Sequence, residues 1–307
     1  MSSILTNSAA MTALKSLQAT NMALETTQSR ISTGLKVGQA ADNAAYWSIA
    51  TTMRSDNKAL ATVQDALGLG SAKVDVAYTG MNASIDVVDE IKAKLVAARE
   101  PGVDKSKIQS EIGELQNQLS SIAVSASFSG ENWLSQDSSA VGYTATKEIV
   151  GSFNRASDGS VSVGTVSISI TSTKLFDANA AASGILDLDF TTTGAGAVTV
   201  SVSTLDITAA NVDNTDLDEM ISAVDGALSS MTTSASDLGA SQKRIDMQSD
   251  FVANLIDAID RGVGTLVDAD MSKESTRLSA LQTQQQLGTQ ALAIANSSAQ
   301  SILALFR

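Results

Sequence analysis

The sequence LDEMISAVDGALSSMTTSASDLGASQKRIDMQSDFVANLIDAIDRGVGTL, residues 217–266, carries the clearest structural signal in this chain of 307 residues. From Leu217, alternating steps of four and three residues reach fifteen positions, and thirteen of them are apolar. A hydrophobic period of 3.5 residues over this length predicts a coiled-coil helix of roughly 75 Å. Asp216 and Glu219 have the spacing of a capping box. Four acidic residues near the start of this helix could cap it or bind a cation: Asp213, Asp216, Asp218 and Glu219. Their spacing is not that of a calcium loop, so helix capping is favoured.

A second apolar register runs from Ala50 to Leu95, with ten of its fourteen positions apolar. Pro101 ends that helix, and Asp104 is placed to cap a third one that runs back along it. These helices cannot bury their apolar stripes alone, and the 217–266 stripe is the natural partner. Polar residues at seam positions are expected to fix the register: Asn57, Gln64, Gln242 and Gln285.

Residues 141–210 change to the alternation of apolar and polar residues that is typical of strands. This alternation predicts strands at 166–170, 186–190 and 198–202. Asp187 and Asp189 then lie two apart on one strand, which favours a solvated face over a pair for acid–base work. The predicted fold class is therefore mainly α: a long antiparallel coiled-coil helical bundle with both termini paired, plus a small inserted β region.

Composition excludes several classes of chemistry. The chain has no Cys and no His, so it has no disulfide, thiolate nucleophile, imidazole base or histidine metal ligand. Its net charge of −13 disfavours binding to nucleic acid. No apolar run is long enough to predict a membrane span, and no cleavable signal peptide is visible. We predict no enzymatic activity, no catalytic residues, no metal site and no cofactor.

The two ends of the chain have apolar stripes but few charges. Residues 278–306 contain no charged side chain, whereas residues 211–270 carry a net charge of −9. A solvated helix normally has a charged outer face, so the ends are expected to contact protein on several sides, mainly other copies of the chain. The predicted contact residues are Ile4, Met11, Leu14, Leu17, Leu24, Ile31, Leu278, Leu281, Leu292, Ala295, Asn296, Ile302, Leu305 and Phe306.

The terminal segments also resemble the bacterial flagellins, the subunits of the flagellar filament, of the α-proteobacterial (rhizobial) type. The N-terminal signature is matched by Ser-Arg-Ile-Ser-Thr-Gly-Leu-Lys-Val at residues 29–37, and the closing motif by residues 295–307. Residues 128–132, Phe-Ser-Gly-Glu-Asn, resemble the junction between helix and hairpin. The resemblance covers roughly the first 135 and last 95 residues.

This resemblance implies three domains. Residues 1–41 and 271–307 are expected to pair as the terminal helical core domain, and residues 42–140 and 211–270 to form a helical bundle domain with β-hairpins. Residues 141–210 are the expected variable, outward-facing β region.

The resemblance further implies a protein that is exported through the flagellar type III channel and polymerises with itself, and with related flagellins, into an extracellular filament for swimming. The implied partners are an export chaperone, the filament cap and the hook–filament junction proteins. Two alternatives remain open at this stage: a hook–filament junction protein, and a coiled-coil signalling or adhesion rod.

Two departures from the family pattern concern recognition by immune receptors. Flagellins detected by the mammalian innate receptor have two arginines where this chain has Val87 and Asp89, followed by Glu90. The segment sensed by plants corresponds to residues 28–50, and it departs from the recognised pattern at Ala41, Asn43, Tyr46 and Trp47. The resemblance therefore predicts escape from the mammalian receptor and weak recognition by plants.

Overall fold

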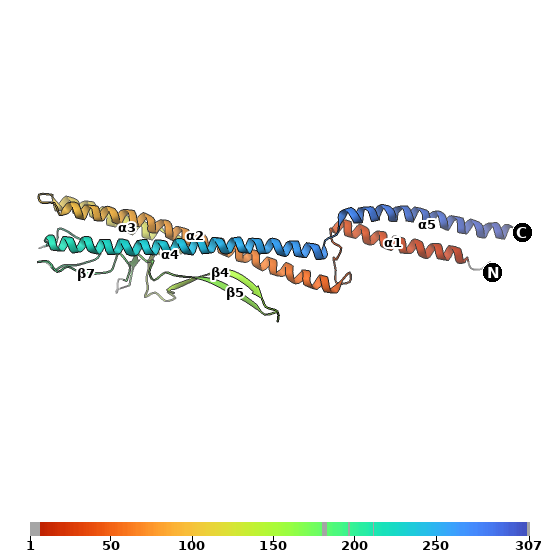
Figure 1. The fold of residues 1–307 in the computed structure, drawn as a ribbon, viewed down its shortest axis with the longest axis horizontal. Coiled ribbons are helices and arrows are strands. Elements are labelled where there is room, and N and C mark those ends of the chain that lie inside the picture. The colour runs from red at the N-terminus through yellow and green to blue at the C-terminus, as the bar shows by residue number, and fades with distance from the viewer. Residues whose placement is uncertain (1–6, 180–182, 196, 211, 306–307) are drawn as a thin grey trace. The chain divides into compact units, whose positions relative to one another are not determined.

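A computed structural model of the chain describes residues 7–179, 183–195, 197–210 and 212–305, with side chains in the last segment described through residue 298. The described helices are α1 (Ser8–Thr33), α2 (Ala44–Ala98), α3 (Lys105–Ser125), α4 (Asn214–Val267) and α5 (Met271–Leu305) (Figure 1). The chain forms two compact units, residues 1–58 with 256–307 and residues 59–255. Helices α2 and α4 each contribute residues to both units.

The two predicted heptad seams are confirmed. All fifteen seam positions of α4 and all fourteen of α2 are buried or half-buried. In the second unit, Gln242 donates a hydrogen bond to Asp75 (3.3 Å), and Lys92 pairs with Asp225 (2.5 Å). The residue numbers of both pairs add up to the same total, as they must when two antiparallel helices keep one register. Fully buried side chains such as Leu67 fill the interface.

The helix termini follow the expected chemistry with one correction. Asp104 caps α3 by accepting a hydrogen bond from the Ser106 N–H at 3.1 Å. The capping box of α4 lies three residues earlier than predicted: Asp213 accepts from the Asp216 N–H, and Asp216 accepts from the Asp213 N–H. Glu219 lies outside the box because it instead accepts hydrogen bonds from Thr193.

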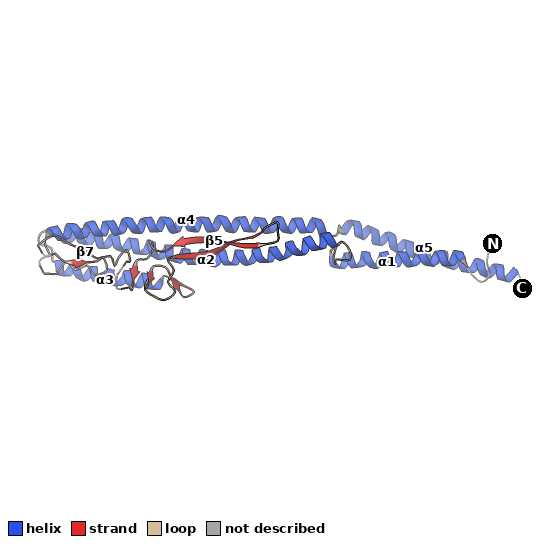
Figure 2. Cartoon of the chain, turned by 90° about the horizontal axis from the view of Figure 1, so that it is seen from below, coloured by secondary structure: helices blue, strands red, loops and turns tan. Residues whose placement is uncertain are grey.

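In the described part of the second unit, the strands form four two-stranded pieces (Figure 2). Three are antiparallel: β1 (Ser127–Phe128) with β2 (Glu131–Asn132), β4 (Thr146–Arg155) with β5 (Val161–Ser169), and β7 (Phe190–Thr191) with β8 (Thr199–Val200). The fourth pairs β3 (Ser135–Gln136) with β6 (Phe176–Asp177) in parallel. The β1–β2 hairpin confirms the expected junction after the helices.

Of the three predicted strands, only 166–170 is largely confirmed, as the end of β5. The prediction for 186–190 is wrong: residues 185–187 form a turn, and β7 begins only at Phe190. The turn is closed by the Leu188 N–H, which donates to the Gly184 carbonyl at 3.0 Å. The Leu186 N–H anchors the turn by donating to the Leu175 carbonyl at 3.0 Å. At 198–202, the strand is only the two residues of β8. The longest strand, β4, was not predicted.

The β4–β5 hairpin packs against α2 at a glycine. A Cβ atom at Gly70 would overlap the side chain of Ile149, so only glycine lets β4 approach the helix this closely. Ile149 pairs in register with Val166, and both side chains are buried. The root of the hairpin is therefore anchored on the helices.

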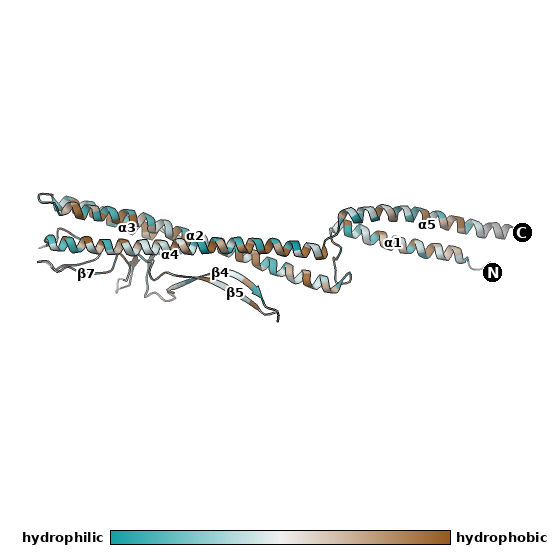
Figure 3. Cartoon of the chain, in the orientation of Figure 1, coloured by the Kyte–Doolittle hydropathy of each residue, from teal (hydrophilic) through white to brown (hydrophobic). Residues whose placement is uncertain are grey.

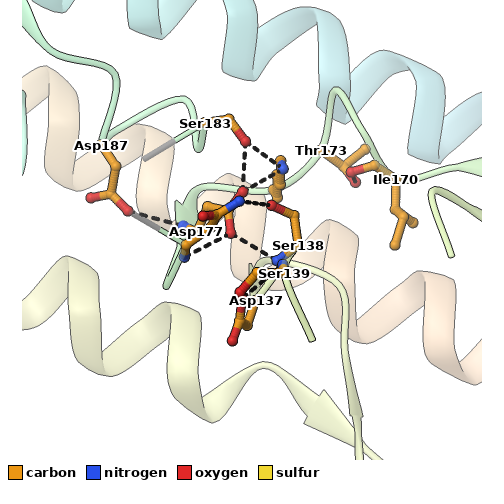
Figure 4. Close-up of polar contacts among 10 residues, drawn as sticks. Asp137, Ser138, Ser139, Ile170, Thr173, Asp177, Ser183 and Asp187 are labelled. Atoms are coloured by element: carbon orange, nitrogen blue, oxygen red, sulfur yellow. Dashed lines mark hydrogen bonds and ion pairs between the residues drawn. The ribbon is translucent and has the colours of Figure 1, made fainter. Parts of the chain in front are cut away.

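A buried ion pair organises the loops around β6 (Figure 4). Lys174 donates to Asp177 at 2.6 Å and to Ser183 at 2.7 Å, and both charged side chains are almost fully buried. Asp177 also accepts from the Ser138 N–H at 2.9 Å. Burial alone would raise the pKa of Asp177, but the hydrogen bonds from Lys174, Ser183 and Ser138 outweigh it and hold the pKa well below its usual value.

The predicted solvated face of Asp187 and Asp189 is wrong for the first of them. Asp187 is half-buried and accepts hydrogen bonds from the Asp177 N–H and the Ser203 hydroxyl, both at 2.9 Å. Asp189 is exposed. Asp187 therefore has a structural role in the loops, because it satisfies a backbone N–H that would otherwise lack a partner.

We expect Asp177→Asn to destabilise the second unit by about 3 kcal/mol, because it leaves the Lys174 ammonium buried without an opposite charge. Urea unfolding followed by circular dichroism measures this, with the exposed Asp189→Asn as the control. The folded state keeps Asp177 ionised at a pH where the unfolded chain binds a proton. The stabilisation of the folded state by ionised Asp177 is therefore present above about pH 4 and is lost as the pH falls below it. An equally stable Asp177→Asn variant would contradict the structural role.

Leucines two residues apart on α2 test the seam. Leu67 is fully buried and Leu69 is 49% exposed. Leu67→Ala should lower the free energy of unfolding by about 3 kcal/mol, because it leaves a cavity in the seam. Leu69→Ala should change it by less than about 0.5 kcal/mol. Similar losses for both variants in urea unfolding would show that the seam is misassigned.

Candidate self-assembly surface

Helices α1 and α5 run antiparallel to each other within the first unit (Figure 1). At one end, the Asn7 side-chain amide donates to the Ala295 carbonyl at 2.9 Å. In the middle, the Gln285 side-chain amide donates to that of Asn21 at 2.8 Å. At the other end, Arg30 pairs with Glu274 at 3.4 Å. The polar seam residue Gln285 thus fixes the register of the pair as predicted.

One seam joins the two helices. Buried and half-buried residues recur along α5 at steps of four and three from Glu274 to Ala295, and α1 has a matching series from Ala10 to Ile31. Gly288 lets Leu17 come close, since a Cβ atom there would lie 3.2 Å from Leu17 Cδ1. Seven of the predicted contact residues lie in this seam: Leu17, Leu24, Ile31, Leu278, Leu281, Leu292 and Ala295.

Exposed apolar side chains lie on the outer faces of both helices. Figure 3 shows that hydrophobic residues are distributed along α1 and α5. On α1, Met11 is 57% exposed and Met22 is 68% exposed. On α5, Leu287 is 58% exposed and Ile294 is 66% exposed. Leu287 and Ile294 are seven residues apart and therefore share one face of the helix, roughly opposite the seam. Helix α5 thus has a second apolar face that no described residue covers.

The remaining predicted contact residues have different positions. Leu14 and Asn296 are exposed. Ile302 and Leu305 belong to α5, but their side chains lie outside the described part. Ile4 and Phe306 lie outside the described residues. Met22, Leu287 and Ile294 were not among the predicted contact residues, although the seven-residue interval between Leu287 and Ile294 indicates that these two share a helix face.

Short segments connect this helix pair to α2 and α4. Leu35 bridges to Asp268, and beneath them a small core contains Val37, Ala50, Val263 and Val267. Across the same unit, Asn57 donates a hydrogen bond to Asp260 at 2.5 Å. These contacts hold the start of α2 beside the end of α4.

A polar cavity of about 480 Å³ lies among these connecting segments. Its acidic side chains serve local structure: Asp42 accepts from the Gly38 and Gln39 N–H groups, and Asp270 caps α5 by accepting from the Ser272 N–H. Glu274 is buried beside Arg30. In the part of the chain that the structure describes, no cluster of acidic residues is arranged to hold a metal ion. Among the described helices, none is long and apolar enough to cross a membrane.

The residues at which the resemblance predicts altered receptor recognition lie in different environments. Val87 is buried on α2 with 6% exposure, whereas Asp89 and Glu90 are exposed. Ala41 is exposed, and Tyr46 and Trp47 are 43% and 39% exposed at the start of α2. The side chain of Asn43 accepts a hydrogen bond from the Tyr46 N–H at 3.1 Å. Val87 is therefore part of the core, and Asp89 is available to a partner.

Comparison with known proteins identifies relatives along the whole chain. Residues 4–139 match the bacterial flagellin N-terminal helical region, and residues 221–306 match the bacterial flagellin C-terminal helical region. The chain is 56% identical to Flagellin C and 48% identical to Flagellin A of Rhizobium meliloti (strain 1021), with 100% of each chain covered. It is also 48% identical to a flagellin of Brucella melitensis biotype 1, again over 100% of both chains.

Proposed function

The chain belongs to the bacterial flagellin family and is a structural subunit of the flagellar filament, and we propose that its terminal helices form the interior of that filament through the faces that one chain leaves uncovered. The supporting observation is the second apolar face of α5, where Leu287 and Ile294 are more than half exposed. Flagellins assemble into a homopolymer, so other copies are the available partners. Contacts that repeat without closing give an open helical filament.

Burial in the polymer stabilises the apolar faces. Covering a Leu or Ile side chain contributes about 1.5–3 kcal/mol, and every subunit repeats the contact. Residues 278–298 have no charge that burial would have to desolvate. We propose that the α1–α5 pair becomes ordered fully only when neighbouring copies cover it.

The proposed contact surface has two layers. Seven residues pair α1 with α5 and so shape the surface, namely Leu17, Leu24, Ile31, Leu278, Leu281, Leu292 and Ala295. Met11, Leu14 and Asn296 are exposed and available to a second copy. For Ile4, Ile302, Leu305 and Phe306 the proposal rests on the sequence alone.

The domain division is part of the same proposal. Residues 1–41 and 271–307 form the interior domain, residues 42–140 and 211–270 form the surrounding bundle, and residues 141–210 face outward. The acidic balance of residues 211–270 supports their contact with water.

Export and the remaining partners follow from family membership. We propose that the subunit leaves the cell through the flagellar type III channel and functions outside it. There it would meet the filament cap, the hook–filament junction proteins and related flagellins, after contact with an export chaperone inside the cell. Full-length matches to flagellins favour the filament subunit over a junction protein or a signalling rod. We propose no enzymatic role, in keeping with a structural family.

Substitutions on the second face of α5 test the interior role. Leu287→Asp, and separately Ile294→Asp, should prevent filament growth from seeds, because a carboxylate buried in an apolar contact costs several kcal/mol. Electron microscopy and sedimentation of the polymer measure the result. Circular dichroism should be unchanged, because both residues lie outside the seam.

Val141→Asp is the matched control, since Val141 is fully exposed in a loop of the second unit and receives the same change in charge. That variant should form filaments like the parent chain. Normal filaments from both α5 variants would show that this face is not buried in the polymer.

We also propose that this subunit escapes the mammalian flagellin receptor. A receptor reads exposed side chains, and at the two positions of interest the chain has a buried valine, Val87, and an exposed acidic residue, Asp89. An arginine-binding surface would be repelled by the carboxylate. For residues 28–50, the substitutions at Ala41, Asn43, Tyr46 and Trp47 support weak recognition by plants.

Purified subunit is expected to give no response in receptor reporter cells, and Asp89→Arg is expected to give a partial one, because it removes the repulsion. A flagellin with both arginines serves as the positive control. A strong response to the parent subunit would refute the proposed escape. For the plant receptor, a normal oxidative burst with a synthetic peptide of residues 28–50 would refute the proposed weak recognition.

A further inference from the structure

The outer half of the β4–β5 hairpin has its apolar side turned away from the helices. Near the root, Ile149 and Val166 point inward and are buried. A β-bulge between Val150 and Ser152 then shifts the register of β4. Beyond it, the pair Phe153 and Val163 lies on the outward side, because side chains alternate along each strand.

This outward side forms an exposed apolar strip. Val161 is 50% exposed and Val163 is 56% exposed. The inward side of the same segment has the small polar pairs Ser152 with Gly164 and Asn154 with Ser162. Folding the hairpin tip onto the helices of its own chain would therefore bury polar residues and leave the valines in water.

A second exposed apolar pair lies on α4 in the same unit. Met247 is 58% exposed and Phe251 is 59% exposed, and residues four apart share one face of a helix. One turn earlier on this face, Arg244 donates to the Ser167 carbonyl at 2.8 Å, which fixes the root of the hairpin there. The hairpin of the same chain covers α4 at Arg244, but it leaves Met247 and Phe251 largely uncovered.

We propose that the outward strip of the hairpin docks on Met247 and Phe251 of a second copy in the filament. An open helical polymer needs two different complementary patches on each subunit, and these two surfaces supply one such pair. Their spacings match: residues four apart on a helix are about 6 Å apart along the axis, and residues two apart on a strand about 7 Å. Two side chains of one copy therefore meet two of the other.

Charge sets the direction of docking. Arg155 is the register partner of Val161, so a positive charge lies at that end of the strip. On α4, Asp250 adjoins Phe251. Met247 has Asp246 beside it but both Lys243 and Arg244 one turn before it, so the Met247 end is the more positive. Opposite charges meet when Val161 covers Phe251 and Val163 covers Met247. The reverse direction would bring Arg155 toward Lys243.

The absence of native cysteines allows a direct test by cross-linking. Val163→Cys and Met247→Cys are made in separate subunits, which are mixed, grown into filaments from seeds and oxidised. A disulfide between these single cysteines can form only between copies. We expect a reducible covalent dimer at least about tenfold more abundant than with Val141→Cys in place of Val163→Cys, because disulfide formation needs Cα atoms within about 7 Å.

Exchanging the charges of Arg155 and Asp250 provides a second test of the docking. Arg155→Asp and Asp250→Arg should each slow filament growth, and the double variant should restore it. Filaments that grow normally but give no more dimer than the Val141→Cys control would overturn the inference. The inference rests on self-assembly and not on the role of α5, so such a result leaves the proposed interior helices intact. Conversely, if the Leu287→Asp and Ile294→Asp variants form normal filaments, the cross-link still tests docking of the hairpin.

Discussion

One helix partner covers only one side of a helix, and this limit governs the terminal part of the chain. Helix α5 has its seam from Glu274 to Ala295 filled by α1, yet Leu287 and Ile294 lie on the other side in water. No charged residue on residues 278–298 makes that side a solvated surface. A protein of this composition gains stability when more chains arrive, because each added neighbour covers apolar area without desolvating a charge.

In the second unit, several elements of one chain cover different sides of the same helix. The antiparallel register of α2 and α4 is fixed by a mainly apolar seam and by cross-helix pairs such as Lys92 with Asp225. The hairpin root and α3 cover further sides of α2, so Leu67 and Met81 are fully buried within one chain. This unit is therefore stabilised by contacts within one chain. Its exposed apolar residues are not needed for that stability and are available for contacts between copies.

The heptad seams were predictable because a 3.5-residue period is a local signal that lasts over many turns. The strands were not, because tertiary contacts decide them. Leu186 alternates with polar neighbours as in a strand, yet it lies in a turn that the Leu188 N–H closes on the Gly184 carbonyl. In β4, the bulge at Gly151 interrupts the alternation that would have revealed the strand. At the termini, the apolar positions are visible in the sequence, but only the observed pairing of α1 with α5 shows which of them lie in the seam and which lie on the outer face.

The composition of the two seams supports the proposed coupling of assembly and folding at the termini. The α2–α4 seam contains fully buried large side chains such as Leu67 and Met81. In the described part of the α1–α5 pair, Leu281 is the one large apolar side chain that is buried, and the seam includes Gln285 and Gly288. The α1–α5 pair is consequently the weaker of the two interfaces when it stands alone. A weak pair with apolar outer faces gains most from neighbouring chains, which is the physical basis of the proposal that the termini become fully ordered only in the polymer.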